Sequence, residues 1–275
     1  ICVVEVDKRP NLAPSCCTPV TEGMVVKTNS QRAISARRTM LGLLLSNHPK
    51  DCLICAMNQN CELQRLAHEF DVHEIKYQGE QNEFPIDVSS GAIRRDPTKC
   101  VMCRRCETAC NVVQTVGVLS GVNRGFDATV APENFKPLIE TSCTFCGQCV
   151  MACPVGSLTE ISYKDEVWSA INDPTKHVVI QTAPSVRVAL GEEFNLPAGT
   201  ITTGKMVAAL RRLGFAKVFD TNFSADLTIM EEGTELISRL KTGRNLPLLT
   251  SCCPGWVNFF EHQFPELLHM PSSAK

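Results

Sequence analysis

Two cysteine runs decide the fold of this chain: Cys100-Val-Met-Cys-Arg-Arg-Cys-Glu-Thr-Ala-Cys110 and Cys143-Thr-Phe-Cys-Gly-Gln-Cys-Val-Met-Ala-Cys153-Pro154. Both have the spacing C-x2-C-x2-C-x3-C, and they form an internal repeat about forty residues apart. With this spacing, three thiolates of one tight loop hold three corners of a 4Fe-4S cluster, and the fourth cysteine reaches the other cluster. The runs therefore predict two such clusters, with Cys100, Cys103, Cys106, Cys110, Cys143, Cys146, Cys149 and Cys153 as ligands.

Zinc and disulfides are the rival uses of these cysteines. Zinc prefers two C-x2-C pairs separated by a spacer and needs only four ligands, which fits two four-cysteine runs poorly. Disulfide-dense chains are usually small and secreted, whereas this chain has 275 residues and shows no signal peptide. Because the sequence opens with Ile1, the missing signal is weak evidence by itself.

The composition of the remainder is ordinary, and it excludes several classes of function. Lys and Arg number 27 against 29 for Asp and Glu, so no basic field exists to hold nucleic acid. The apolar fraction of 44% predicts folded domains. The longest apolar runs fall far short of the roughly 18 to 20 residues that a spanning helix needs, so we expect no membrane insertion. Thiolate-held clusters fit a reducing cytoplasm.

A third ligand set precedes the two runs, namely His48-x3-Cys52-x2-Cys55-x5-Cys61. On spacing alone these four side chains could hold zinc, but beside two electron-carrying clusters a 4Fe-4S cluster with one imidazole ligand is the better interpretation. An amphipathic helix over residues 31–46, with Ser30 as its N-cap, delivers the chain to His48, which could also cap that helix. A short helix over residues 61–70 is expected to follow.

The first residues, Ile1 to Val6, are strand-like. Cys2 and Cys16 resemble the second half of a plant-type 2Fe-2S site, whose other two ligands would precede Ile1. A core position for Cys2, facing inward from the strand, is nearly as plausible. Spacing alone does not decide between Cys16 and Cys17 as the second ligand.

The last third of the chain alternates between predicted strands and helices. Strands are expected over residues 177–182, 216–220 and 246–250, and helices over 204–213 and 226–240. Such alternation predicts a parallel α/β sheet, in which chemistry gathers at the carboxyl ends of the strands. Cys252 and Cys253 follow the last of these predicted strands immediately.

The heptapeptide Thr250-Ser-Cys-Cys-Pro-Gly-Trp256 is similar to the first signature of the iron-only (FeFe) hydrogenases. The resemblance extends over the whole chain, through Thr182–Arg187 and Phe219–Phe223, in the order of the multi-cluster members. It implies that Cys253 binds the 4Fe-4S part of the H-cluster and that Cys252 exchanges protons with the bridging dithiolate of its di-iron part. The segment lining the di-iron pocket would be Ala183, Pro184 and Ser185.

The resemblance also implies a proton route from Cys252 through Glu232, Ser272 and Glu235 to Arg239. The spacing agrees in part, because Glu232 and Glu235 stand at i, i+3 and Glu235 and Arg239 at i, i+4 on one helix face. Without the resemblance, the better interpretation is a solvated face with a surface ion pair.

The predicted fold is α+β and multi-domain. Residues 1–30 would be the remnant of a β-grasp 2Fe-2S domain, 31–76 a small helical domain for the one-histidine, three-cysteine cluster, 84–165 a bacterial-type two-cluster ferredoxin domain, and 174–275 the start of an α/β H-cluster domain. A complete H-cluster domain supplies three further cysteines in later motifs that are missing here. We therefore expect a fragment that by itself does not assemble the H-cluster.

The resemblance implies an enzyme that reversibly combines two protons and two electrons into hydrogen, with electrons relayed through the 4Fe-4S clusters. Ferredoxin, or flavin- and NAD(P)-binding subunits of a larger complex, would be the redox partners. The alternative is a relay-only subunit of an NADH or formate dehydrogenase complex, because the N-terminal modules also resemble the electron-entry parts of those enzymes. Residues 250–256 favour the hydrogenase, since a relay has no use for adjacent cysteines there.

Overall fold

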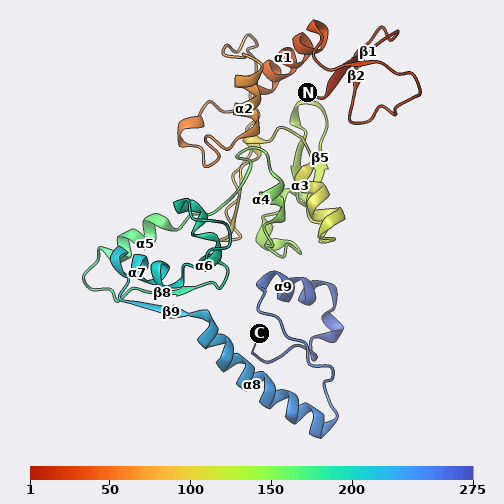
Figure 1. Cartoon of the computed structure of the whole chain (residues 1–275). Coiled ribbons are helices and arrows are strands. Elements are labelled where there is room, and N and C mark those ends of the chain that lie inside the picture. The colour runs from red at the N-terminus through yellow and green to blue at the C-terminus, as the bar shows by residue number, and fades with distance from the viewer. Residues whose placement is uncertain (275) are drawn as a thin grey trace. The chain divides into compact units, whose positions relative to one another are not determined.

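The computed structural model describes residues 1–274, which divide into two compact units, Ile1–Ile161 and a second one beginning at Ser162 (Figure 1). The strands are β1 (Val3–Val6), β2 (Ala13–Pro14), β3 (Val26–Lys27), β4 (Ile93–Arg95), β5 (Ser120–Val122), β6 (Thr129–Ala131), β7 (Leu158–Glu160), β8 (Val179–Thr182) and β9 (Lys217–Asp220). The helices are α1 (Gln31–Ser46), α2 (Glu62–Glu69), α3 (Arg105–Thr108), α4 (Gln148–Ala152), α5 (Lys164–Ile171), α6 (Val186–Ala189), α7 (Thr203–Leu213), α8 (Thr221–Thr242) and α9 (Pro254–Gln263). Single helical turns of other types lie at Cys52–Ile54, Pro97–Lys99, Ala109–Val113, Gly125–Asp127, Glu133–Phe135, Leu138–Glu140, Glu192–Phe194 and Pro265–Leu267.

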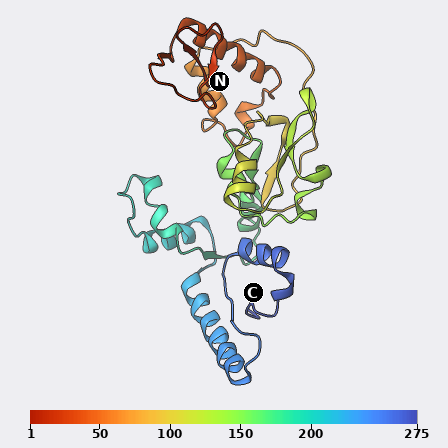
Figure 2. The ribbon, with the colours of Figure 1, turned by 90° about the vertical axis from the view of Figure 1, so that its right-hand side faces the viewer.

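The first unit opens with a small antiparallel sheet of order β2-β1-β3. Val4, Val6 and Ala13 form its buried core, which confirms the strand expected at the N-terminus. Helix α1 lies beside β1 (Figure 2) and has the predicted bounds. The side chain of Ser30 accepts a hydrogen bond from the Ala33 N–H at 3.2 Å, as expected of an N-cap.

The two cysteine runs are built into the second half of this unit. Strands β4 and β7 pair antiparallel, as do β5 and β6, and the apolar residues Ile93, Leu119, Leu138 and Leu158 make the core between them. The cysteines pack around this core. Helices α3 and α4, which carry Cys106 and Cys149, are in contact.

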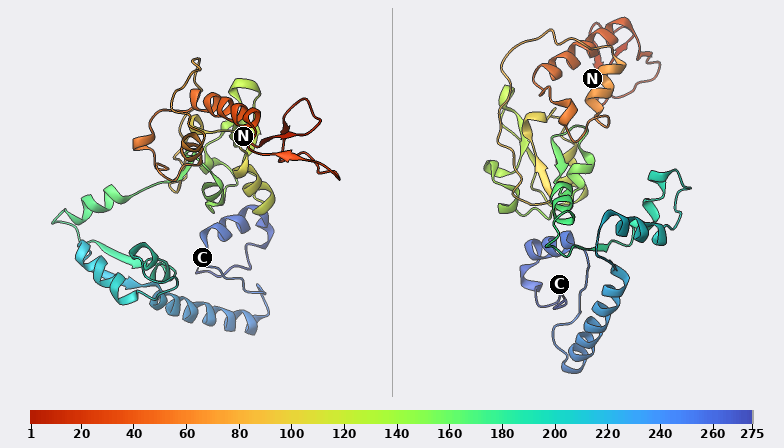
Figure 3. Two further views of the ribbon diagram at one scale, coloured as in Figure 1. Left: turned by 45° about the horizontal axis from the view of Figure 1, so that its top comes forward. Right: turned by 90° about the vertical axis from the view of Figure 1, so that its left-hand side faces the viewer.

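The second unit contains β8 and β9, which pair in parallel with Val179 opposite Lys217. Helix α7 packs against β9, as the views in Figure 3 show. Helix α8 follows β9 directly, and the Asp220 side chain caps it by accepting the Asn222 N–H at 3.0 Å. This cap starts the helix at Thr221, which makes it longer at both ends than the predicted 226–240.

The strand predicted over residues 246–250 is wrong. Leu249 forms a single parallel bridge with Pro271, through its N–H to Met270 and its carbonyl to the Ser272 N–H. Pro247 has no N–H to give to a ladder, and the bridging segment is a loop, so pairing does not extend. Within residues 1–274 the parallel sheet therefore consists of β8 and β9, and Cys253 stands at the N-cap of α9.

No helix in residues 1–274 combines the length and the apolar character needed to cross a bilayer.

Candidate metal centres and proton path

Two cavities in the first unit are lined by the cysteine runs. One is lined by Cys100, Cys103 and Cys106 of the first run together with Cys153 of the second. The other is lined by Cys143, Cys146 and Cys149 together with Cys110. Each cavity thus receives three cysteines from one run and the fourth from the other run, which is the arrangement that the spacing predicts.

The same backbone conformation recurs in both runs and shapes the two loops. Met102 and Phe145, at matching positions, have φ of 53°, and Arg104 and Gly147, also matching, have φ of 60° and 75°. These left-handed residues turn the chain back toward the cavity before α3 and α4 begin. The sequence repeat is therefore a structural repeat.

The donor set of these cavities fits a cluster better than a single ion. Within residues 1–274, no group of three His, Cys, Asp or Glu side chains converges tightly enough to hold one metal ion. A zinc ion would need four sulfurs at about 2.3 Å from one point, and the described residues hold no such group. Burial raises the pKa of the Cys106 thiol to about 12 and does the same for Cys149. Their thiolates therefore need a cationic group such as iron, whose binding would release the protons.

His48, Cys52, Cys55 and Cys61 line a separate cavity. A helical turn over Cys52–Ile54 and the start of α2 after Cys61 position the thiols. Burial lowers the pKa of His48, which favours the neutral imidazole that binds metals. Gly156 lies against this set, because a Cβ there would stand 2.7 Å from Cys55 Sγ.

At the N-terminus the Sγ atoms of Cys2 and Cys16 lie 3.1 Å apart. The Sγ of Cys17 instead lies 3.9 Å from the Pro14 carbonyl oxygen. Cys2 is exposed, so the interpretation of Cys2 as an inward-facing core residue is wrong. The hydrogen bond between the two thiols lowers the pKa of Cys2 and raises that of Cys16. The structure therefore brings Cys16, and not Cys17, to Cys2.

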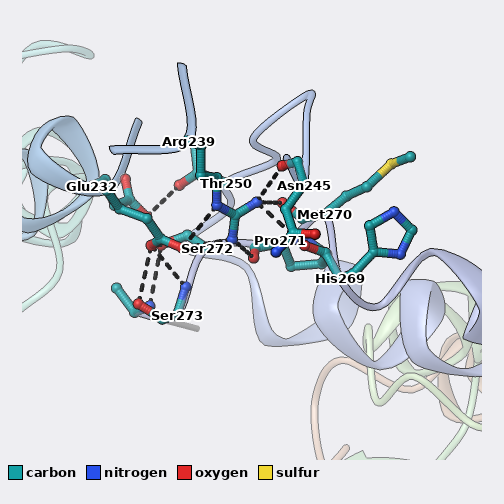
Figure 4. A network of polar contacts seen from close by, with 11 residues as sticks. Glu232, Arg239, Asn245, Thr250, His269, Met270, Pro271, Ser272 and Ser273 are labelled. Carbon is teal, nitrogen blue, oxygen red and sulfur yellow. Dashed lines mark hydrogen bonds and ion pairs between the residues drawn. The ribbon is translucent and has the colours of Figure 1, made fainter. Parts of the chain in front are cut away.

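Polar residues of the predicted proton route meet beside α8 (Figure 4). Arg239 Nε donates to Glu235 Oε1 at 3.0 Å, and Ser272 Oγ lies 3.4 Å from Glu235 Oε2. The side chains of Arg239 and Glu235 are only 12% and 21% exposed, so this pair is not the solvated surface pair of the alternative interpretation. The Ser273 N–H and then Arg239 lower the pKa of Glu235, which therefore carries a negative charge at neutral pH.

The other members of the route lie near the heptapeptide. Thr250 Oγ1 donates to Glu232 Oε1 at 2.6 Å, which ties α8 to the residues just before Cys252. Cys252 and Cys253 are exposed.

Ala183, Pro184 and Ser185 form the exposed loop between β8 and α6. Arg187, in the same motif, donates to Asp220 Oδ1 at 2.9 Å and so links the motifs at 182–187 and 219–223.

Sequence reasoning missed several polar residues at these sites. They are Asp51 and Lys99 near the His48 set, Arg95 in the first ferredoxin-type cavity, and Thr250 and Ser273 beside α8. Asp51 and Lys99 each immediately precede a predicted ligand, and this position is the signal in the sequence that could have pointed to them. The pairings themselves join residues far apart in the sequence.

Models of known protein families match four stretches of the chain. Residues 176–275 match the iron only hydrogenase large subunit, C-terminal domain. Residues 37–76 match the NADH-ubiquinone oxidoreductase-G iron-sulfur binding region, residues 1–31 a 2Fe-2S iron-sulfur cluster binding domain, and residues 137–159 a 4Fe-4S binding domain.

Whole proteins are similar along the full chain. The NADP-reducing hydrogenase subunit HndD of Solidesulfovibrio fructosivorans is 61% identical over 100% of this chain and 48% of its own length. Iron hydrogenase 1 of Clostridium pasteurianum is 40% identical over 100% of this chain and 48% of its own length. The chain thus spans about half the length of these curated relatives. A crystal structure of an NAD+-reducing [NiFe]-hydrogenase in the H2-reduced state is similar with a TM-score of 0.54 and 25% identity, over 58% of this chain and 68% of that one.

Proposed function

The chain is related over its whole length to the iron-only hydrogenases, and from this premise we propose that it carries the electron-relay modules and the first part of the catalytic domain of such an enzyme. The proposed reaction is the reversible combination of two protons and two electrons into hydrogen. One observation carries the proposal: a chain with three cysteine-lined cavities also contains the Cys252–Cys253 heptapeptide inside a hydrogenase-domain match.

The modules would have the predicted bounds: 1–30 for the 2Fe-2S domain, 31–76 for the His48 site, 84–165 for the two-cluster ferredoxin domain and 174–275 for the start of the H-cluster domain. Iron-sulfur clusters at these sites would supply one-electron transfer, and the H-cluster would supply the hydrogen chemistry. The chain's part is to hold the clusters and to set the polarity around them. Cys2 and Cys16 would contribute to the 2Fe-2S site, and Cys253 to the H-cluster.

The side chains beside α8 would carry protons. Cys252 would exchange a proton with Glu232, and Ser272, Glu235 and Arg239 would complete the path. Support comes from the contacts of Ser272 and Arg239 with Glu235 and from the hydrogen bond of Thr250 to Glu232. Hydrogen-bonded carboxylates and hydroxyls at such distances can pass a proton with small rotations of their side chains.

A partner that handles NADP is favoured over ferredoxin as the redox partner. The relative at 61% identity is named a subunit of an NADP-reducing hydrogenase. We therefore propose that flavin- and NAD(P)-binding subunits exchange electrons with the N-terminal modules. A relay-only subunit remains the second candidate, supported by the match of residues 37–76 to an NADH-ubiquinone oxidoreductase region.

Anaerobic reconstitution with iron and sulfide tests the relay half of this proposal. The chain should acquire acid-labile sulfide and the electron paramagnetic resonance (EPR) signals of reduced 4Fe-4S clusters. A colourless, iron-free product would overturn the proposal. The hydrogenase half is tested in a longer protein that contains this sequence and the remaining H-cluster ligands. There Cys252→Ala should abolish hydrogen evolution without loss of the relay clusters, and a wild-type protein with clusters but no hydrogen turnover would favour the relay-only subunit.

A further inference from the structure

Arg95 is a buried cation without an ion pair in the ferredoxin-type module. Its exposed fraction is 4%, and its Nη1 donates to the Val130 carbonyl oxygen at 3.3 Å. Its buried Nε–H has no hydrogen-bond partner. Within residues 1–274, no carboxylate lies within ion-pair distance of this guanidinium. Burying a guanidinium whose N–H group has no hydrogen-bond acceptor costs free energy, so we expect an acceptor or a negative charge beside it.

The fold holds Arg95 in this place. Side chains alternate along β4, so that Ile93 and Arg95 point into the module while Arg94 points outward. Pairing with β7 sets Arg95 opposite Leu158, and a backbone bridge to Asp87 secures its other edge. The strand register therefore fixes the inward direction of the guanidinium.

The side chain of Arg95 lines the cavity formed by Cys100, Cys103, Cys106 and Cys153. Burial lowers the pKa of Arg95, while negative charge on Asp87, Cys100 and Cys106 acts in the opposite direction. The Asp87 carboxylate already accepts the N–H groups of Ser89 and Leu138. The Asp87 carboxylate keeps its charge and acts on Arg95 from beyond ion-pair distance, and the cysteines of the cavity, once ionised by a bound cluster, would add negative charge directly beside the guanidinium.

The second cavity has no corresponding cation. No Arg, Lys or His is among the residues that line it, and its polar side chains other than thiols are those of Gln114, Thr144 and Gln148. The two cysteine runs repeat each other in spacing and in backbone conformation, but their cavities differ by one buried positive charge.

We propose that the Arg95 guanidinium donates a hydrogen bond to a sulfur of the cluster held by Cys100, Cys103, Cys106 and Cys153, and thereby makes this cluster the higher-potential one of the ferredoxin pair. The inference rests on the proposed function, because it needs clusters in both cavities. Hydrogen bonds to sulfur and nearby positive charge stabilise the reduced, more negative state. Reduction would add one electron to this cluster while Arg95 stays protonated. Because its potential would be the higher of the two, this cluster would be reduced before the other cluster of the pair.

Redox titration of the reconstituted full chain tests the inference. Arg95→Gln removes the charge, and Arg94→Gln on the opposite face of the same strand is the matched control. Arg95→Gln should shift one ferredoxin-type EPR signal to a lower midpoint potential and leave the other unchanged, and Arg94→Gln should shift neither by a comparable amount. In wild-type chain labelled with 15N-arginine, pulsed EPR should show a nitrogen coupling to the same reduced cluster, and Arg95→Lys should remove it.

The outcomes separate this inference from the proposed function. Wild-type chain that takes up no iron overturns both. If the wild type assembles both clusters, unchanged potentials in Arg95→Gln overturn the inference alone. Should Arg95→Gln not fold, the nitrogen couplings of the wild type and Arg95→Lys decide, and a coupling that is absent from the wild type or unchanged in Arg95→Lys overturns the inference alone.

Discussion

Lys99 Nζ lies 2.7 Å from Asp51 Oδ2 and joins the His48 site to the first ferredoxin-type run. Each residue immediately precedes a predicted ligand, Asp51 before Cys52 and Lys99 before Cys100. Burial opposes the charge of Lys99, but its hydrogen bond to Asp51 holds its pKa above the usual value. Lys99 in turn lowers the pKa of Asp51. This ion pair therefore links the segment of the His48 site to the segment of the first ferredoxin-type run.

Replacing Lys99 should loosen the His48 site. Lys99→Met leaves Asp51 without its partner, and we expect a loss of about 1–3 kcal/mol in local stability, less than for a fully buried pair because Asp51 is partly exposed. Hydrogen exchange of peptides covering residues 48–61 should become about 10- to 100-fold faster in the cluster-free chain. Lys27→Met is the control, since the Lys27–Asp7 pair is exposed on both sides and should change exchange by less than about fivefold. Equal effects of the two variants on exchange would argue against a stabilising role of the Lys99–Asp51 ion pair.

Charge beside the first run should also tune its cluster. Arg104 Nη2 donates to Glu107 Oε1 at 2.8 Å, so each side chain partly cancels the other's field. Arg104→Gly keeps the left-handed backbone and should lower the midpoint potential, whereas Glu107→Gln should raise it. The shift of Arg104→Gly should be smaller than that of Arg95→Gln, because the Arg104 side chain is 57% exposed and solvent screens its charge. Redox titrations in which both variants shift in the same direction would contradict this account.

Arg239 should hold the C-terminal segment onto α8. Besides Glu235, its guanidinium donates to the carbonyl oxygens of Asn245, His269, Met270 and Pro271 (Figure 4). Lysine cannot reproduce this fork, so Arg239→Lys should destabilise the second unit by about 2–4 kcal/mol. Denaturant unfolding followed by tryptophan fluorescence measures the change, because Trp168 and Trp256 both lie in this unit. Arg212→Lys, at an exposed position of α7, should change stability by less than about 0.5 kcal/mol.

The proton path predicts a defect confined to turnover. In a longer protein with all H-cluster ligands, Glu232→Ala should abolish hydrogen turnover, and Glu232→Gln, which keeps the shape but accepts no proton, should slow it by about 10²-fold or more. The EPR signals of the clusters should stay unchanged in both variants. Glu261→Gln, on the exposed face of α9, is the control and should retain full activity. Unimpaired turnover in Glu232→Ala would refute the relay.

Local patterns predicted much of this molecule. Cysteine spacing indicated the two interleaved sets, and the structure places Cys110 and Cys153 in the opposite cavities as expected. The apolar periodicity and Ser30 predicted α1 at its observed bounds. The strand predicted over residues 246–250 is wrong, because a strand needs a neighbouring strand with which it can form hydrogen bonds. In this segment Leu249 forms a single bridge with Pro271.

The sequence by itself determined which side chains can bind iron and sulfide, because ligand spacing and helix periodicity are short-range properties that one segment carries alone. Tertiary structure decided what surrounds those ligands. The Lys99–Asp51 pair, the bond of Arg95 to the Val130 carbonyl oxygen and that of Arg239 to the Met270 carbonyl oxygen each join segments more than twenty residues apart. Such contacts depend on strand register and on how the loops close, and no local pattern encodes these.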